Sequence, residues 1–163
     1  MKPKLSFVIP AKNEEESVTT LYKQITDVVK PLRKTFEIIF VDDGSTDTTF
    51  EVLQSIYKKD KRIKVIKLRG NFGKSIALQI GFENSNGEII FTLDADLQDN
   101  PKEIPNFLKK LDDGYDLVSG WKKVRRDPLT KVLPSRVFNF ATSFLTGVKI
   151  HDTNCGFKVY RRE

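Results

Sequence analysis

Two aspartates spaced two residues apart, Asp94 and Asp96, follow a short apolar run in this sequence. In an extended strand such residues share one face. Two neighbouring carboxylates repel each other unless a cation lies between them, so the pair suits Mg²⁺ or Mn²⁺ held together with substrate phosphates. Asp-x-Asp is also common in turns and at helix caps, and the motif alone leaves both interpretations open.

A second acidic motif follows another apolar run and reads Asp42-Asp43-Gly44-Ser45-Thr46-Asp47. A carboxylate at such a strand end can accept hydrogen bonds from a base or a ribose. A local role also fits, with Gly44 making the turn and Ser45 or Asp47 capping the next helix. Both interpretations are compatible if Asp42 binds the nucleotide and Asp47 caps the next helix.

The third motif is the segment Arg69-Gly70-Asn71-Phe72-Gly73-Lys74. It lacks the spacing of a P-loop, and the sequence contains no Gly-x-Gly-x-x-Gly fingerprint. It still combines flexible glycines, a predicted helix N-terminus and the cation of Lys74, which together favour a diphosphate. An ordinary loop with a solvent-facing Lys74 is the alternative.

The net charge of +6 is concentrated in one segment, between Gly120 and Arg136. Six basic residues there face a single aspartate: Lys122, Lys123, Arg125, Arg126, Lys131 and Arg136 against Asp127. The segment is either a solvated face or a site for phosphate groups or an anionic membrane surface. Nucleic acid is not expected as a partner, because no nucleic-acid-binding motif accompanies the charge.

The elements that must position these motifs alternate between short apolar runs and helical patterns, which predicts an α/β fold with a mostly parallel sheet. Strands are predicted at 5–9, 36–41, 63–68, 88–93, 115–118 and 156–160, and helices at 14–29, 47–57, 74–83, 101–111 and 129–145. Asn13 is the expected N-cap of the first helix, and Pro101 fits the first turn of the fourth. Three of the motifs therefore follow strands, where open α/β sheets bind their ligands.

Size and composition indicate one globular domain, with 163 residues, 39% hydrophobic and 31% charged. Cys155 is the only cysteine, which excludes an intrachain disulfide and suits a reducing cytosol. The N-terminal residues do not resemble a secretory signal. The longest uncharged apolar stretch, 137–148, is shorter than the roughly 20 residues that span a bilayer.

Four motifs in this order closely resemble family 2 glycosyltransferases with the GT-A fold: residues 8–14, 42–45, 71–74 and 94–98, which read VIPAKNE, DDGS, NFGK and DADLQ. Within that family the sequence is most similar to dolichyl-phosphate mannose synthases and bacterial polyprenyl-phosphate glycosyltransferases, from Leu5 to Arg162. The resemblance implies one catalytic domain over residues 1–163, with a mostly parallel central sheet flanked by helices. It implies inverting transfer of a hexose from a UDP- or GDP-sugar to a polyprenyl phosphate, either undecaprenyl or dolichyl phosphate. Among the candidate donors we favour UDP-glucose.

The resemblance also assigns residues. The donor pocket would contain Pro10, Asn13, Glu14, Asp42, Asn71, Gly73, Lys74 and Asp94. Asp94, Asp96 and Gln98 would hold Mg²⁺ or Mn²⁺ and the diphosphate, with Asp96 catalytic. Lys122, Lys131, Ser135 and Arg136 would bind the acceptor phosphate, and Asp152 would act as a base or position the acceptor. Lysines stand where some relatives have arginines, which keeps the charge but loses the bidentate geometry.

Relatives of this kind usually continue into amphipathic and transmembrane helices, so we expect a chain without its C-terminal membrane-anchoring helices. The expected location is the cytoplasm, at the cytosolic face of the membrane, and homo-oligomerisation stays open. Three alternatives also stay open. The chain could transfer sugar to a sugar hydroxyl in cell-wall or polysaccharide synthesis, act as a nucleotidyltransferase that releases pyrophosphate, or bind a nucleotide-sugar without turnover.

Overall fold

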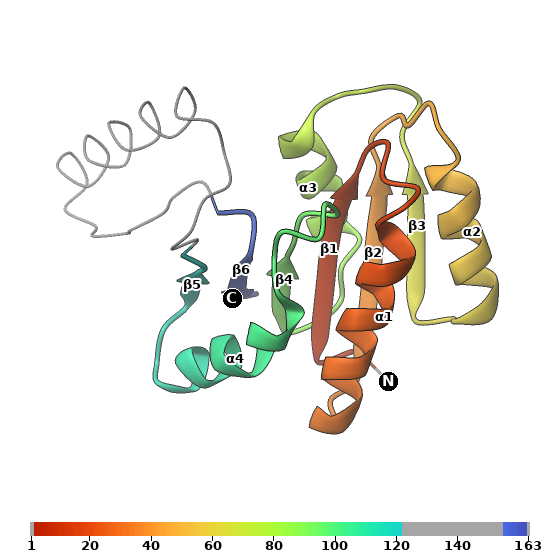
Figure 1. Cartoon of the computed structure of the whole chain (residues 1–163). Helices are drawn as coiled ribbons and strands as arrows, with labels where there is room; N and C mark the ends of the chain where they lie inside the picture. The colour runs from red at the N-terminus through yellow and green to blue at the C-terminus, as the bar shows by residue number, and fades with distance from the viewer. Residues whose placement is uncertain (1, 122–154, 163) are drawn as a thin grey trace, which may run out of the picture.

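The structure is a computed structural model that describes residues 2–121 and 155–162. Six strands form one mixed sheet in the order β3-β2-β1-β4-β6-β5 (Figure 1). Their bounds are β1 Leu5–Ala11, β2 Phe36–Asp42, β3 Ile63–Lys67, β4 Ile89–Thr92, β5 Leu117–Ser119 and β6 Lys158–Arg161. β1, β2, β3 and β4 are parallel, whereas β6 runs antiparallel to both β4 and β5. The prediction of a mostly parallel sheet flanked by helices is confirmed.

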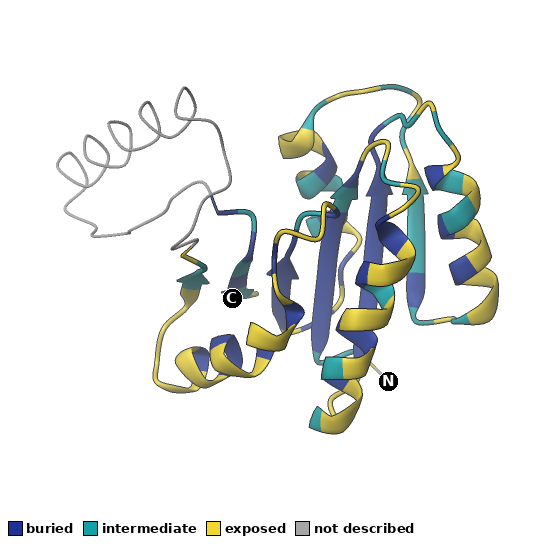
Figure 2. Cartoon of the chain, in the orientation of Figure 1, coloured by how far each residue is buried: buried dark blue, intermediate teal, exposed yellow. Residues whose placement is uncertain are grey.

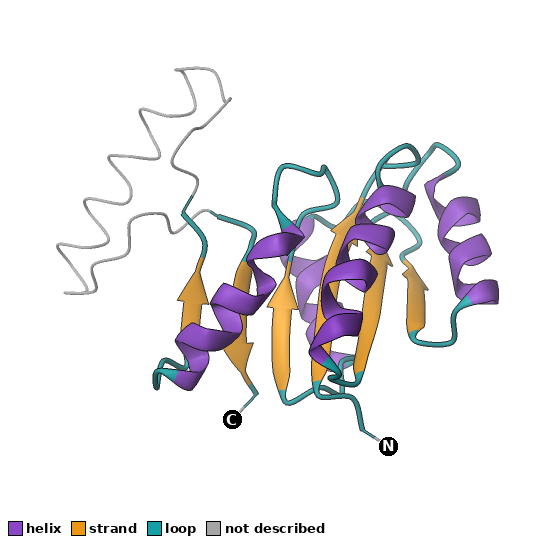
Figure 3. Cartoon of the chain, turned by 60° about the horizontal axis from the view of Figure 1, so that its bottom comes forward, coloured by secondary structure: helices purple, strands orange, loops and turns teal. Residues whose placement is uncertain are grey.

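Helices cover both faces of this sheet (Figures 1 and 3). α1 (Val18–Val29), α2 (Thr49–Lys59) and α4 (Ile104–Asp112) contribute to the larger apolar cluster on one face. α3 (Lys74–Glu83) packs on the opposite face, where Ala77 meets Val8, Ile39 and Val41. Two short 3₁₀ turns, η1 (Lys30–Leu32) and η2 (Pro101–Glu103), complete the described elements. The central strands are therefore buried on both faces, as their near-continuous apolar sequences require (Figure 2).

Aromatic rings join the parallel half of the sheet to the antiparallel edge. Phe7 of β1 stacks on Phe91 of β4 with ring centroids 5.0 Å apart. Phe107 of α4 stacks on Phe157 at 4.4 Å, and Phe91 contacts both of these rings. Large buried rings contribute much of a core's stability. This cluster therefore fixes the segment before β6 against the end of β4, where the aspartate pair begins.

The start of the first helix differs from the prediction. α1 begins at Val18, and the preceding residues form a turn in which the Glu14 carbonyl accepts from the N–H groups of Ser17 and Val18. Asn13 is not the N-cap, because its side-chain oxygen accepts from the N–H of Thr46 and its backbone adopts a positive φ of 56°. A contact with a distant loop has taken the place of the local cap.

Other predicted boundaries agree more closely. The second helix begins at Thr49 with Thr48 as its N-cap, and the predicted cap Asp47 lies one residue earlier, where its Oδ1 accepts from the Thr49 N–H at 3.0 Å. Pro101 lies in the first turn of η2, and α4 continues from it. The helix predicted at 129–145 lies outside the described residues.

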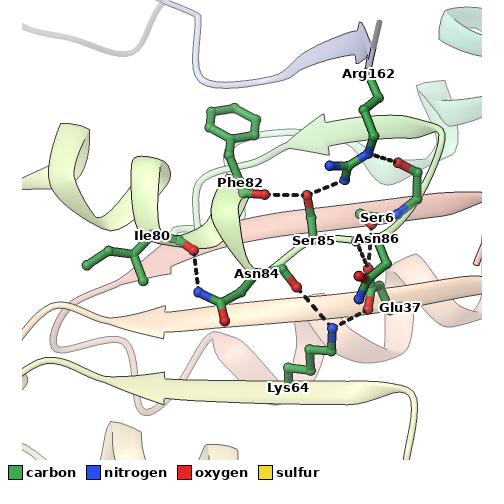
Figure 4. A network of polar contacts seen from close by, with 10 residues as sticks. Ser6, Glu37, Lys64, Ile80, Phe82, Asn84, Ser85, Asn86 and Arg162 are labelled. Atoms are coloured by element: carbon green, nitrogen blue, oxygen red, sulfur yellow. Dashed lines mark hydrogen bonds and ion pairs between the residues drawn. The ribbon is translucent and has the colours of Figure 1, made fainter.

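A polar network holds the loop between α3 and β4 against β2 (Figure 4). Glu37 is buried, and its carboxylate accepts from Ser6 Oγ at 2.7 Å and from the Asn86 N–H, and pairs with Lys64 Nζ at 2.8 Å. Burial raises the pKa of Glu37, but these partners outweigh burial and hold the pKa below its ordinary value. Lys64 also donates to the Asn84 carbonyl. The ionised Glu37 thus anchors the entry into β4.

Arg162 fastens the same loop from the far end of the chain (Figure 4). Its Nε donates to the Gly87 carbonyl and its guanidinium to Ser85 Oγ, both at 2.6 Å. Its backbone N–H donates to the Glu88 carbonyl at 3.0 Å. β4 is therefore fixed at its start by Glu37 of β2 and by Arg162, which directly follows β6.

In the part of the chain that the structure describes, no helix is both long enough and apolar enough to cross a membrane.

Candidate active site

The predicted motifs lie together at one edge of the sheet. β1, β2 and β4 are neighbouring parallel strands, so their carboxyl ends meet at the same edge. The chain places β2 and β3 on one side of β1 and β4 on the other. β1 is thus the point at which the strand order changes direction, and open α/β sheets bind ligands in the crevice at such a point.

Asp42, the last residue of β2, has an unusual environment. Its side chain is fully buried, and Oδ1 accepts from the Ser45 N–H at 3.1 Å. Among the described residues, Oδ2 is buried without a hydrogen-bond partner. A buried carboxylate oxygen that lacks a donor is costly. The position therefore suits an acceptor for an N–H or O–H of a bound ligand.

Asp43 has a role that the sequence did not assign. It is buried, and its Oδ1 and Oδ2 accept from the N–H groups of Phe72 at 2.7 Å and Gly73 at 2.9 Å. Gly44 follows with a φ of +68°, and a Cβ on it would lie 2.4 Å from the carbonyl carbon of Gly70. The loop after β2 and the loop before α3 are thus in direct contact. In the sequence, the acidic pair at the end of β2 was the only feature that could have indicated this contact.

Asn13 and Glu14 connect the loop after β1 to the loop after β2. Besides its contact with Thr46, Asn13 donates its N–H to Ser45 Oγ at 3.0 Å. The Glu14 N–H donates to Thr49 Oγ1 at 2.8 Å, and its carboxylate accepts from Ser17 Oγ. Both residues were predicted to bind the nucleotide-sugar, and in this structure they support the rim of the site. The half-buried Pro10 lies beside Val41 in the sheet.

Asp94 lies just beyond β4 and forms an ion pair with Lys74, the first residue of α3. Lys74 Nζ is 2.5 Å from Asp94 Oδ1, and the side chains are 48% and 25% exposed. Thr92 Oγ1 donates to the Gly156 carbonyl at 2.7 Å and holds that glycine beside Asp94. A Cβ on Gly156 would lie 2.4 Å from Asp94 Oδ2. The site thus brings together two of the predicted residues and a glycine that the sequence did not single out.

Asp96 is exposed at the same edge. The buried Ala95 separates it from the half-buried Asp94, and this segment is a turn after β4 rather than the extended strand that the sequence suggested. Asp96 Oδ1 accepts from the Gln98 N–H at 3.0 Å, and Leu97 between them has a φ of +60°. In the described ranges, no three His, Cys, Asp or Glu side chains gather to hold a metal. Two carboxylates still fit Mg²⁺ or Mn²⁺, because such ions commonly take one or two carboxylates together with substrate phosphates.

A cavity of about 460 Å³ lies at the opposite ends of the strands, lined by Pro3, Lys34, Thr35, Phe36, Glu37, Lys61, Arg62 and Lys64. Two of its cations are already paired, Arg62 with Asp60 and Lys64 with Glu37. The carboxyl ends of the strands, rather than this cavity, are the expected ligand site of such a sheet.

The predicted acceptor residues Lys122, Lys131, Ser135 and Arg136, and Asp152, lie outside the described residues.

The sequence model of the family "Glycosyl transferase family 2" matches residues 6–163. The chain belongs to this family. The family 2 chain is 40% identical over 159 residues to an undecaprenyl-phosphate 4-deoxy-4-formamido-L-arabinose transferase of Pseudomonas paraeruginosa, covering 97% of this chain and 47% of that protein. It is 38% identical over 160 residues to a dodecaprenyl-phosphate galacturonate synthase of Rhizobium johnstonii, covering 96% and 47%. The chain thus spans about half the length of these curated relatives.

Solved structures of glycosyltransferases show the same GT-A fold. A glucosyl-3-phosphoglycerate synthase of Mycobacterium tuberculosis, in complex with Mn²⁺ and UDP-glucose, matches with a TM-score of 0.72 at 22% identity, over 98% of this chain and 56% of that one. A mannosyltransferase of Pyrobaculum calidifontis, in complex with GDP-Man and Mn²⁺, matches with a TM-score of 0.67 at 19% identity, over 99% and 45%. The predicted family and fold are both confirmed.

Proposed function

We propose that this family 2 glycosyltransferase transfers a hexose, with inversion, from a nucleoside diphosphate sugar to a polyprenyl phosphate. The observation that carries the donor half is the presence of acidic residues at the carboxyl ends of β2 and β4, the two strands that flank β1. Asp42 offers a buried, unpartnered oxygen, while Asp94 and Asp96 offer carboxylates at the surface of the same edge. A nucleotide lying across this edge would place a base or ribose at Asp42 and its diphosphate at the aspartate pair.

The leaving group is a nucleoside diphosphate, whose developing negative charge must be neutralised. Mg²⁺ or Mn²⁺ held by Asp94 and Asp96, with Gln98 beside them, supplies Lewis acidity and a template for the diphosphate. Lys74 begins α3, so its ammonium and the first N–H groups of that helix add positive potential at the same place. Asn71 and Gly73 are our proposed donor-binding residues in the preceding loop, which Asp43 holds in place by accepting from the Gly73 N–H.

The acceptor half rests on the names of the relatives, which are both polyprenyl-phosphate transferases. A lipid phosphate is already largely anionic near neutral pH, so cations that position it matter more than a base. Lys122, Lys131, Ser135 and Arg136 are our proposed acceptor-phosphate residues, and Asp152 our proposed base or acceptor-positioning group. We also propose that the chain acts at the cytosolic face of the membrane.

A lipid-extraction assay with radiolabelled UDP- and GDP-sugars tests this function. Label should enter the organic phase with Mn²⁺ and stay out of it in EDTA. Asp96→Ala should lower the rate by about 10²-fold, whereas Asp27→Ala, which removes an exposed aspartate from α1, should not. Transfer that survives both EDTA and Asp96→Ala would contradict the metal-dependent mechanism.

The same assay separates the alternatives. Label in a water-soluble glycan would indicate a sugar hydroxyl as the acceptor, and release of pyrophosphate would indicate a nucleotidyltransferase. Nucleotide binding without any transfer would indicate a binding module. The preference for UDP or GDP, and for one hexose, comes from the same panel of donors.

A further inference from the structure

The ion pair between Lys74 and Asp94 places an ammonium group on one of the two proposed metal-binding carboxylates. Lys74 Nζ lies 2.5 Å from Asp94 Oδ1. Magnesium coordinates carboxylate oxygens at about 2.0–2.1 Å and carries two positive charges. A metal ion and the Lys74 ammonium would therefore repel each other strongly at the same oxygen. A cation that binds Asp94 through Oδ1 has to displace Lys74.

The Asp94 carboxylate has little room to avoid this competition. The Asp94 N–H donates to Asp99 Oδ2, and the carboxylate lies directly against Gly156, where even a Cβ would not fit. Thr92 Oγ1 holds Gly156 in that position through its carbonyl. Gly156 therefore blocks one side of the Asp94 carboxylate, so the ion pair is relieved most easily by movement of the lysine.

The backbone at Lys74 is also fixed, but the Lys74 side chain has room to move. Asp43 accepts from the N–H groups of Phe72 and Gly73 and so holds the loop directly before Lys74. The Lys74 side chain itself is 48% exposed. Its ammonium can therefore leave Asp94 while the start of α3 stays in place. A diphosphate at this helix N-terminus would offer the ammonium a second anionic partner.

We propose that Lys74 is a placeholder for the metal ion: it neutralises Asp94 when no donor is bound and transfers to the diphosphate when the donor arrives. This inference rests on the proposed function of the site. Its consequence is that nucleotide and metal bind cooperatively, because the nucleotide removes the cation that competes with the metal. By linkage, the metal strengthens nucleotide binding by the same factor.

Binding measurements without turnover test this proposal. Free Mn²⁺ would be followed by electron paramagnetic resonance in titrations of the full chain, alone and with UDP or GDP, corrected with protein-free Mn²⁺–nucleotide titrations. In Lys74→Met we expect Mn²⁺ alone to bind about fivefold more tightly, since an exposed ion pair of this kind competes by about that factor. The enhancement of Mn²⁺ binding by nucleotide should fall by at least the same factor.

Two variants serve as controls. Lys58→Met removes an exposed lysine from the last turn of α2 and should leave Mn²⁺ binding unchanged. Lys74→Arg keeps the charge and should retain weak binding of Mn²⁺ alone. If Lys74→Met binds Mn²⁺ no more tightly than the wild type does, the placeholder is refuted while the donor site stands. If the wild type binds neither Mn²⁺ nor nucleotide, the proposed function fails and the placeholder fails with it.

Discussion

Gly156→Ala tests whether the position of one carboxylate depends on a glycine 62 residues away along the chain. The new Cβ would lie 2.4 Å from Oδ2 and 2.6 Å from Cγ of Asp94. Real Cβ atoms do not approach other atoms so closely, and the three nearest atoms all belong to the Asp94 carboxylate. Because that group ends a side chain, it can rotate away. The substitution should therefore move Asp94 and leave the sheet intact.

The expected cost to stability is small, because its parts largely offset each other. Moving the carboxylate off its preferred rotamer costs about 0.5–1.5 kcal/mol, and loss of the exposed Lys74 ion pair costs about 0.2–1 kcal/mol. Alanine restricts the unfolded chain more than glycine does, which returns about 0.4–1 kcal/mol. The net change is on the order of 1 kcal/mol, equivalent to about 2–4 °C in Tm for a chain of this size.

The expected cost to metal binding is larger, because a displaced Asp94 carboxylate would no longer be in position to hold the ion together with Asp96. A loss of about 10–100-fold in Mn²⁺ affinity in the presence of nucleotide is typical when the support of a metal ligand is disturbed. Gly70→Ala is the matched control for stability, since a Cβ there meets nothing within 4 Å, and Asp27→Ala, an exposed position on α1, is the control for Mn²⁺ titration. Thermal unfolding and Mn²⁺ titration would be measured on Gly156→Ala and its controls. Unchanged Mn²⁺ affinity in Gly156→Ala, or a Tm lowered by more than about 10 °C, would refute this reasoning.

Two further predictions concern stability. Gly44→Ala should cost about 3 kcal/mol or more, or about 6–12 °C in Tm, because its Cβ would collide with the Gly70 backbone at a φ of +68°. Gly73→Ala shares the positive φ but has open space, so a loss as large there would mean that strain rather than collision decides. Asp60→Asn should cost about 1 kcal/mol at pH 7, where screening of the partly exposed Arg62 reduces the effect. The hydrogen bonds from Arg62 lower the pKa of Asp60 from 3.8 to about 2, so the Asp60 contribution is complete above about pH 5 and is lost as pH falls through about 2. The difference in urea midpoint between wild type and variant should shrink by about half at pH 3, and a difference independent of pH would contradict the assignment.

Much of the fold could be predicted from the sequence, because its signals are local. The apolar runs that became β1 and β2 stand out from neighbours a few residues away, and the turn residues after them mark where each strand ends. Since carboxyl ends of parallel strands share one edge, the meeting of the motifs at that edge also followed. The contact of Asp47 at the start of α2 is equally local, as its carboxylate accepts from an N–H only two residues ahead.

The predicted start of α1 was wrong because it, too, was based on local signals alone. Asn13 has the side chain of an N-cap, and nothing nearby in the sequence contradicts that role. In the folded chain the N–H of Thr46 lies within 2.9 Å of its side-chain oxygen, and a hydrogen bond across two loops replaces the local one. Such competition depends on which strands become neighbours, and the sheet order is decided by packing across the whole domain.

Some features of the site follow from local sequence, whereas others depend on contacts between distant residues. Local pattern alone places Asp42 at the end of one buried strand and Asp94 and Asp96 after another, because strand periodicity and carboxylate chemistry are properties of each segment. The ion pair of Lys74 with Asp94, and the contact of Gly156 with that carboxylate, form only in the folded chain. These contacts join residues 20 and 62 positions apart, and no local pattern encodes them. They form when β4 packs beside β1 and β6 pairs antiparallel with β4, because this arrangement buries the apolar faces of the strands.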